Sequence, residues 1–231
     1  SLLGRNNALN IYGPTGIKTF IEQSIQFTHS HLSFPLNIHE LDATQHTHIL
    51  RNETIDVYTI PLQHRVPCCG YLFREIQRLP RINTEKITAY NIPNQAIRAI
   101  KMDGIDYILP NGRTISNAEL TLAPYPSRAF AYCSDTAYHE PLIPIIQNVD
   151  LLYHEATYLE RHAAQAVVSM HSTAKQAASI AQQARAKRLI LGHYSSRYSN
   201  IELLRTEAET IFTHAELGIE GRTYVVPLER T

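Results

Sequence analysis

The sequence has no excess of either charge sign, few cysteines and no long apolar run. Lys and Arg total 21 residues and Asp and Glu also total 21, so the formal net charge is zero. Bulk charge therefore gives no sign of nucleic-acid binding, and any acidic polymer must be bound by a local basic patch. No apolar run approaches the roughly 18 residues of a membrane span, and no signal peptide is visible.

The three cysteines are Cys68, Cys69 and Cys133. Their number is odd, and their spacing is that of neither a disulfide framework nor a zinc ribbon. We therefore expect a reduced, cytoplasmic protein without membrane contact. The chain begins at Ser1 rather than Met, which leads us to expect a fragment or a processed form. Twelve histidines are a high number and justify a search for metal ligands.

What is present is an alternation of strand-like and helix-like segments. Short apolar or alternating runs predict strands at residues 9–12, 36–41, 55–60, 68–73, 129–133, 150–153, 189–191 and 224–226. Helical spacing of apolar residues predicts helices at 17–28, 173–186 and 201–212 and a helical stretch near 142–148. The alternation favours a mixed α/β fold, and 231 residues suffice for one large domain.

Residues 74–127 differ from the rest, with five prolines and a broken apolar pattern. Asn111-Gly112 predicts a hairpin between residues 107–109 and 114–115. A loop of this length inside a compact domain indicates an inserted functional segment. Between residues 74 and 113 it has seven basic and four acidic residues, a local net charge of +3 (7 − 4). Both a polymer-binding arm and a merely solvated one fit this bias.

Three strand-like segments each lead into a side chain that binds metals well: His64, Asp135 and His193. Sites in helix-covered sheets form at the carboxyl ends of strands. A carboxylate between two imidazoles suits zinc or a similar divalent ion, and its two oxygens could bridge two ions. The alternative is that Asp135 caps a turn and the histidines are ordinary surface residues.

Two further segments add candidates for acid–base chemistry. His171 precedes a helix start, where the helix dipole disfavours its protonation. A carboxylate partner would restore its proton and orient it, and Glu155 is the candidate, leaving His171 able to donate a proton. Ser172 and Thr173 could hold a phosphate through hydroxyls and backbone N–H groups. The alternative is a Ser/Thr helix cap beside an unrelated histidine.

Five segments together resemble one family. They are Gln-His-Arg-Val-Pro at 63–67 with Gly-Tyr at 70–71, Ser-Asp-Thr at 134–136, His-Glu-Ala-Thr at 154–157, His-Ser-Thr-Ala at 171–174 and Gly-His-Tyr-Ser-Ser-Arg-Tyr at 192–198. In this order the chain resembles ribonuclease Z, the tRNA 3′-processing endonucleases of the metallo-β-lactamase superfamily. The resemblance implies a four-layer αββα sandwich, with residues 1–231 as one domain and residues 74–127 as an inserted, flexible tRNA-binding arm.

The resemblance also implies a reaction and the residues for it. The reaction is zinc-dependent hydrolysis that removes the 3′ trailer from precursor tRNA, by a homodimer with two zinc ions, or other divalent ions, per subunit. His64 would bind one ion, His193 the other, and Asp135 both. His171 would donate the proton with Glu155 as its support. Further expected contacts to the scissile phosphate or the tRNA body are Arg197, Ser195, Ser196, Arg98 and Lys101.

Two features depart from the family pattern. The Gly-Pro pair of the family's arm is absent from residues 91–96, and the metal motif His-x-His-x-Asp-His is absent altogether. His29-Ser30-His31 and His46-Thr47-His48 begin like the motif but lack its Asp and last His. We therefore expect a sheet without its first strands and a chain that is inactive alone. Either upstream residues supply the motif, which we favour, or the chain is a non-catalytic RNA-binding relative. Another phosphodiesterase of the superfamily is a third alternative, against which the arm argues.

Overall fold

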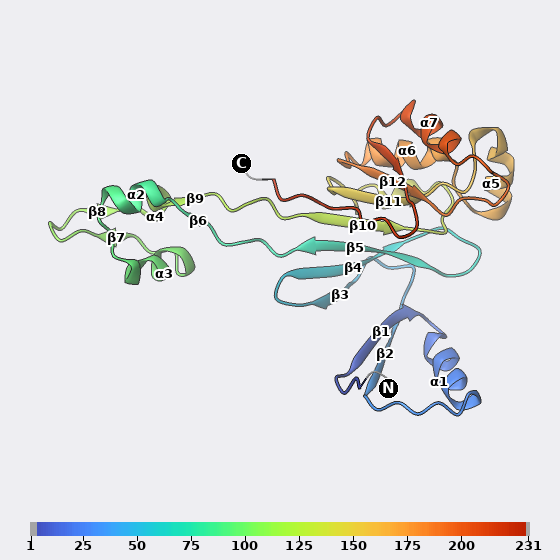
Figure 1. Cartoon of the computed structure of the whole chain (residues 1–231), viewed down its shortest axis with the longest axis horizontal. Helices are drawn as coiled ribbons and strands as arrows, with labels where there is room; N and C mark the ends of the chain where they lie inside the picture. The colour runs from blue at the N-terminus through green and yellow to red at the C-terminus, as the bar shows by residue number, and fades with distance from the viewer. Residues whose placement is uncertain (1–3, 230–231) are drawn as a thin grey trace.

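A computed structural model describes residues 4–229, and a seven-stranded sheet lies at its centre (Figure 1). The strands, in spatial order, are β13 (Ala215–Leu217), β12 (Leu189–Gly192), β11 (Leu151–Glu155), β10 (Ala129–Cys133), β5 (Cys69–Glu75), β4 (Ile55–Pro61) and β3 (His48–Arg51). Strands β10 to β13 are parallel, whereas β10, β5, β4 and β3 pair antiparallel. Strands β4, β10, β11 and β12 therefore all end at the same end of the sheet.

One face of this sheet is covered by helices. They are α5 (Ala163–Ser169), α6 (Ala174–Gln183) and α7 (Glu202–Glu209), with the short 3₁₀ turns η1 (Glu140–Leu142) and η2 (Glu160–His162). Helix α6 packs on β11, β12 and α7 through a fully buried face of small residues and Ile180. It begins at a capping box between Thr173 and Gln176, which satisfies backbone N–H groups that the first turn leaves without partners.

The opposite face of the sheet carries aromatic rings. Tyr132 stacks on Tyr153 with ring centroids 4.6 Å apart, and Phe73 stacks on Phe130 at 5.8 Å. Phe130 and the two tyrosines line a cavity of about 1000 Å³. Gly192 makes room for the neighbouring ring, since a Cβ there would lie 2.0 Å from the Tyr153 hydroxyl. The two faces thus differ, one closed by aliphatic packing and one open and aromatic.

A small N-terminal unit accompanies the sheet. Strands β1 (Leu9–Pro14) and β2 (Leu36–Leu41) pair in parallel, and α1 (Ile17–Phe27) connects them. The Glu40 carboxylate accepts the N–H groups of Gly16 and Lys18 at 2.6 and 3.3 Å, which caps the helix. Helix α1 has no fully buried residue, and Phe20 and Phe27 are exposed. The four layers implied by the resemblance are therefore present only in part.

The arm between β5 and β10 extends away from the sheet (Figure 1) and has a buried core of its own. Its elements are β6 (Arg81–Ile82), α2 (Thr84–Ala89), α3 (Asn94–Met102), β7 (Tyr107–Ile108), β8 (Thr114–Ile115), α4 (Asn117–Leu120) and β9 (Thr121–Leu122). The buried residues are Ile87, Ile92, Ile100, Ile115 and Leu120. Because the arm leaves from the end of β5 and the start of β10, it lies at the opposite end of the sheet from the ends of β10, β11 and β12.

Most predicted elements are confirmed, including the hairpin of β7 and β8. The predicted strand at 224–226 is wrong, because Arg188 and Arg128 donate to the carbonyls of Val225 and Val226 where a neighbouring strand would. The helical stretch near 142–148 is only the turn η1 followed by irregular turns, since Pro144 has no N–H to continue a helix. Strands β3 and β13 and the arm helices were not predicted. None of the helices within residues 4–229 is long and apolar enough to cross a membrane.

Candidate metal centre and active site

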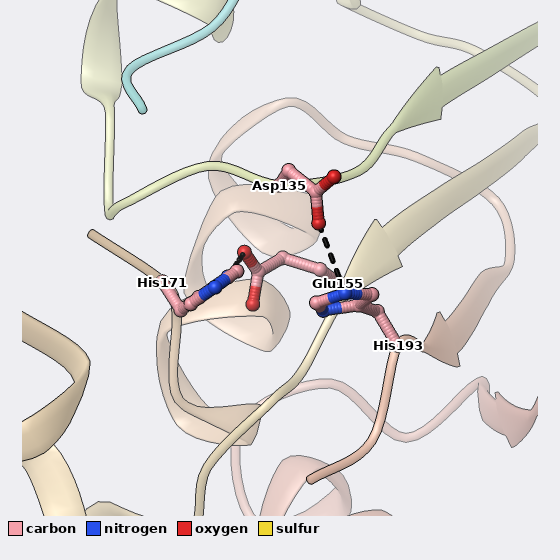
Figure 2. Close-up of side chains that lie close together, drawn as sticks. All are labelled: Asp135, Glu155, His171 and His193. Atoms are coloured by element: carbon pink, nitrogen blue, oxygen red, sulfur yellow. Dashed lines mark hydrogen bonds and ion pairs between the residues drawn. The ribbon is translucent and has the colours of Figure 1, made fainter. Parts of the chain in front are cut away.

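Four side chains meet where β10, β11 and β12 end: Asp135, Glu155, His171 and His193 (Figure 2). Each offers one potential ligand atom, and these atoms all lie within 4.8 Å of one another. Asp135 follows β10 by two residues, Glu155 is the last residue of β11, and His193 directly follows β12. His171 comes from the loop before α6. Three parallel strands thus bring together residues that are far apart in the sequence, as expected for strand ends.

The backbone at this site is unusual. Asp135, His193 and Met170, which precedes His171, have φ angles of 58°, 55° and 57°. These values lie in the left-handed region, which costs a residue other than glycine on the order of 1 kcal/mol or more. The surrounding hydrogen bonds must hold these conformations. Such strain is typical of functional sites, where side-chain direction matters more than local backbone energy.

Glu155 is held in place by hydrogen bonds to both of its carboxylate oxygens. Its side chain is fully buried, and Oε1 accepts hydrogen bonds from His171 Nδ1 at 2.6 Å and from the Thr136 N–H at 2.8 Å. Oε2 accepts from the Ser172 N–H at 3.0 Å and from the Thr157 hydroxyl at 2.6 Å. The expected Glu155–His171 pair is therefore present. Because both oxygens are already satisfied by protein donors, Glu155 orients its neighbours and has little capacity left for an ion.

Asp135 and His193 differ from Glu155, because the Asp135 carboxylate still has an oxygen without a hydrogen-bond partner. His193 Nε2 lies 3.0 Å from Asp135 Oδ1, yet this buried oxygen has no hydrogen-bond partner. An orphaned carboxylate oxygen beside an imidazole nitrogen is an arrangement that a cation satisfies, and zinc takes such N and O ligands. Cys68 donates its thiol to the Asp135 carbonyl at 3.3 Å, and burial raises the pKa of Cys68 to about 11. The Cys68 thiol is thus a hydrogen-bond donor to the backbone beside the Asp135 carboxylate.

His64 lies beside this group without belonging to it. It follows β4 by three residues, and its ring centroid is 4.9 Å from that of His171. Its Nδ1 is 3.0 Å from the Met170 carbonyl oxygen. Since a carbonyl only accepts, Nδ1 carries the proton and Nε2 presents a lone pair. His64 is thus outside the four-residue group, with its Nε2 lone pair unused by the hydrogen bond to Met170.

The other expected contacts are divided between exposed and buried positions. Arg197 is exposed, with its guanidinium 4.9 Å from the Tyr158 ring centroid and its Nε donating to Ser195 Oγ at 3.2 Å. Ser196 is exposed in the same loop. Arg98 and Lys101 are exposed on α3 of the arm, at the end of the sheet remote from the site.

Ser172 and Thr173 are fully buried, so the structure corrects their expected role as phosphate contacts. The Ser172 hydroxyl donates to the Thr136 carbonyl at 2.7 Å, and the Thr173 hydroxyl donates to Glu160 at 2.8 Å. Their backbone N–H groups donate to Glu155 and Gln176. The hydroxyl and backbone N–H donors of both residues are therefore used within the protein. Ser172 and Thr173 stabilise the loop that carries His171 and do not face a substrate.

The sequence reasoning assigned no role to Thr157, which bonds both to Glu155 and to His193. Its place two residues after Glu155 in the His-Glu-Ala-Thr segment was its only signal. A threonine hydroxyl between a strand end and a distant histidine has no sequence pattern of its own. Tyr158 was missed for the same reason, although its ring lies beside both His171 and Arg197.

Comparison with known proteins identifies the family and the fold of the chain. The family described as Beta-lactamase superfamily domain matches residues 70–194, more than half of the chain. A ribonuclease Z of Parabacteroides distasonis is 44% identical over 220 residues, covering 95% of this chain and 72% of that protein. A ribonuclease Z of Porphyromonas gingivalis is 46% identical over 212 residues, covering 91% and 69%.

Solved structures show the same fold at lower identity. Human tRNase Z, short form, superposes with a TM-score of 0.60 and 20% identity, covering 96% of this chain and 68% of that one. A metallo-β-lactamase fold protein of Bacillus subtilis gives a TM-score of 0.54 at 20% identity. The chain spans about 70% of the length of the ribonucleases Z that it matches. The fold is thus a metallo-β-lactamase-like α/β fold, partial with respect to its relatives, and the chain belongs to the ribonuclease Z family.

Proposed function

We propose that this chain carries one side of the active site of a zinc-dependent endoribonuclease that removes the 3′ trailer from precursor tRNA. The observation that carries the proposal is the junction of Asp135 and His193 with the Glu155–His171 pair. It combines a candidate metal site with a histidine held by a buried carboxylate. Family membership supplies the substrate class, because the relatives are named ribonucleases Z.

Asp135 and His193, with His64 beside them, are the residues that would hold the metal. Zinc when bound activates water and neutralises charge that develops on a phosphate. In the reaction, water adds across the P–O3′ bond, which leaves a 3′-hydroxyl on the tRNA and a 5′-phosphate on the trailer. His171 supplies the proton to the leaving 3′-oxygen from Nε2, since its Nδ1–H is donated to Glu155.

Arg197, Ser195 and Ser196 are proposed to contact the scissile phosphate from the loop after β12. The arm is proposed to grip the tRNA away from the cut, with Arg98 and Lys101 on the exposed side of α3. A distant grip is of use for a large substrate and of none for a small phosphodiester. We further propose a homodimer in the cytoplasm, a compartment that suits the three free cysteines.

The test uses the protein expressed from its complete reading frame, incubated with a 3′-extended tRNA precursor and zinc. We expect cleavage after the tRNA body and a loss of at least a hundredfold in kcat/KM for Asp135→Ala and for His171→Ala. Glu209→Ala, at a partly exposed residue on α7, is the matched control and should cleave as the parent does. Cleavage by Asp135→Ala at the parent rate would refute the proposal.

A further inference from the structure

Thr157 lies between the candidate metal ligand and the candidate proton donor. Its hydroxyl oxygen is 2.6 Å from Glu155 Oε2, 2.9 Å from His193 Nδ1 and 3.0 Å from the His193 carbonyl oxygen. Thr157 is only 6% exposed, so water cannot substitute freely for these contacts. The three distances are all hydrogen-bond distances, and one hydroxyl proton has to serve them.

The direction of these hydrogen bonds follows from the donors available. A hydroxyl has one proton, and an ionised carboxylate only accepts. The shortest contact is to Glu155 Oε2, and bonds to a carboxylate are the stronger ones, so the proton of Thr157 points to Glu155. The Thr157 oxygen is then an acceptor towards His193. Nδ1 of His193 must therefore carry its proton and donate it to Thr157.

This direction determines the free nitrogen of His193. With the proton on Nδ1, the neutral ring has a lone pair on Nε2, the atom that faces Asp135. The orphaned state of Asp135 Oδ1 supports this independently. Nε2 is 3.0 Å away, yet the geometry is not that of an N–H donating to this oxygen. Two acceptors face each other, as a site for a cation requires.

We propose that Thr157 is a positioning residue that fixes His193 in the tautomer with a proton on Nδ1 and a lone pair on Nε2. Through Glu155 it joins His193 and His171 into one hydrogen-bonded chain, His193–Thr157–Glu155–His171. The inference rests on the proposed function in that His193 is the metal ligand there. Partners of this kind commonly orient metal-binding histidines, and their loss costs about 10- to 100-fold in metal affinity.

His64 provides an internal comparison. Its tautomer is set by a backbone carbonyl, that of Met170, which no substitution removes. The tautomer of His193 depends on a side-chain hydroxyl and can therefore be tested by mutation. Thr157→Val keeps the shape and removes the hydroxyl, whereas Thr157→Ser keeps the hydroxyl and removes a methyl group. Thr59→Val is the matched control, since Thr59 is also buried and its hydroxyl bonds to residues beside β3 and β4.

The first readout is the tautomer itself, measured in the zinc-free protein by long-range ¹H–¹⁵N NMR of the histidine rings. The pH is held near 8, above the unperturbed His pKa of about 6.5, and His193→Gln identifies the signal. We expect His193 protonated on Nδ1 in the parent, Thr157→Ser and Thr59→Val. In Thr157→Val a form protonated on Nε2 should appear. A parent protonated on Nε2, or a Thr157→Val spectrum like the parent's, would overturn the inference.

The second readout is zinc affinity of the protein from its complete reading frame, measured by competition with a chromophoric chelator. We expect a 10- to 100-fold loss for Thr157→Val, with Thr157→Ser close to the parent. Equal affinity of the Val variant would contradict the positioning role. If Thr157→Val does not fold, the parent tautomer and the Ser variant still decide the matter. Neither readout needs RNA, so failure to cleave tRNA would refute the proposed function and leave this inference standing.

Discussion

The arm and the helix-covered sheet use buried aliphatic residues in the same way but treat polar side chains differently. In the sheet, Glu155, Ser172 and Thr173 are fully buried and bonded to other protein groups. In the arm, the basic residues Arg98 and Lys101 remain exposed. The difference suits the two proposed tasks, since chemistry requires fixed geometry and a distant grip on a polymer requires accessible charge. Four predictions test this contrast, from the largest expected effect to the smallest.

The first prediction compares a buried carboxylate in the sheet with a half-exposed one in the arm. Glu155→Gln removes the charge that accepts from the His171 ring, the Thr157 hydroxyl and three backbone N–H groups. The new amide group also brings an NH₂ donor to a site where its neighbours are themselves donors. We expect a loss of about 3–5 kcal/mol in unfolding free energy together with loss of cleavage. Glu119→Gln, at a carboxylate that accepts from Lys86 and Tyr90, should change stability far less. Urea titration measures both, and equal losses would remove the contrast.

The second prediction asks whether the arm core is energetically separate. Ile100 and Ile180 are both fully buried, one in the arm and one in α6. Truncation to Ala should cost about 3 kcal/mol at either position. Hydrogen exchange should accelerate about a hundredfold in the arm alone for Ile100→Ala, whereas Ile180→Ala should accelerate it in the sheet. Faster exchange throughout the molecule in Ile100→Ala would show one cooperative unit instead.

The third prediction concerns the junction of the two regions. Hydrogen bonds from Arg128 lower the pKa of Glu75 to about 2 from a reference value of 4.5. A carboxyl whose pKa is lowered by folding contributes stability above its unfolded pKa, and the contribution is lost as pH falls from about 4.5 towards 2. We expect it to be on the order of 2 kcal/mol.

Unfolding free energies measured between neutral pH and about pH 3 should therefore fall less in Glu75→Gln than in the parent. Glu202→Gln is the control, because Glu202 forms an exposed pair with Arg205. Its pH dependence should match that of the parent. A Glu75→Gln curve parallel to the parent's over this range would contradict the coupling at the base of the arm.

The smallest expected effect is that of arm charges on tRNA binding. Arg98→Ala and Lys101→Ala should each weaken binding a few-fold and leave the rate at saturating tRNA unchanged. If each contacts one phosphate, the slope of log affinity against log salt should decrease by about 0.7–0.9 per substitution. Gln95→Ala, an uncharged exposed residue of the same helix, is the control. A lower saturated rate would place these charges in the chemical step.

Much of this protein could be predicted from its sequence. Mostly apolar segments of strand length indicate β10, β11 and β12, because strands in a helix-covered parallel sheet are rich in apolar side chains. The segment of β4 was also predicted, although Asp56 and Thr59 within it are buried polar residues. The spacing of small residues and the Thr173 cap define α6. The expected ligands and proton donor share one property visible in the sequence, namely that each lies within three residues after a strand or before a helix.

Only the tertiary structure decided which of these polar side chains are satisfied by hydrogen bonds within the protein and which remain free to bind a ligand. The sequence cannot show that Glu155 is satisfied by protein donors while Asp135 keeps an oxygen without a partner, because that depends on which N–H groups the folded loops bring within 3 Å. It likewise cannot show that Ser172 and Thr173 are buried, or that Thr157 reaches a histidine 36 residues away. Sequence patterns record local geometry and burial, whereas the direction of a hydrogen bond is set by distant parts of the chain.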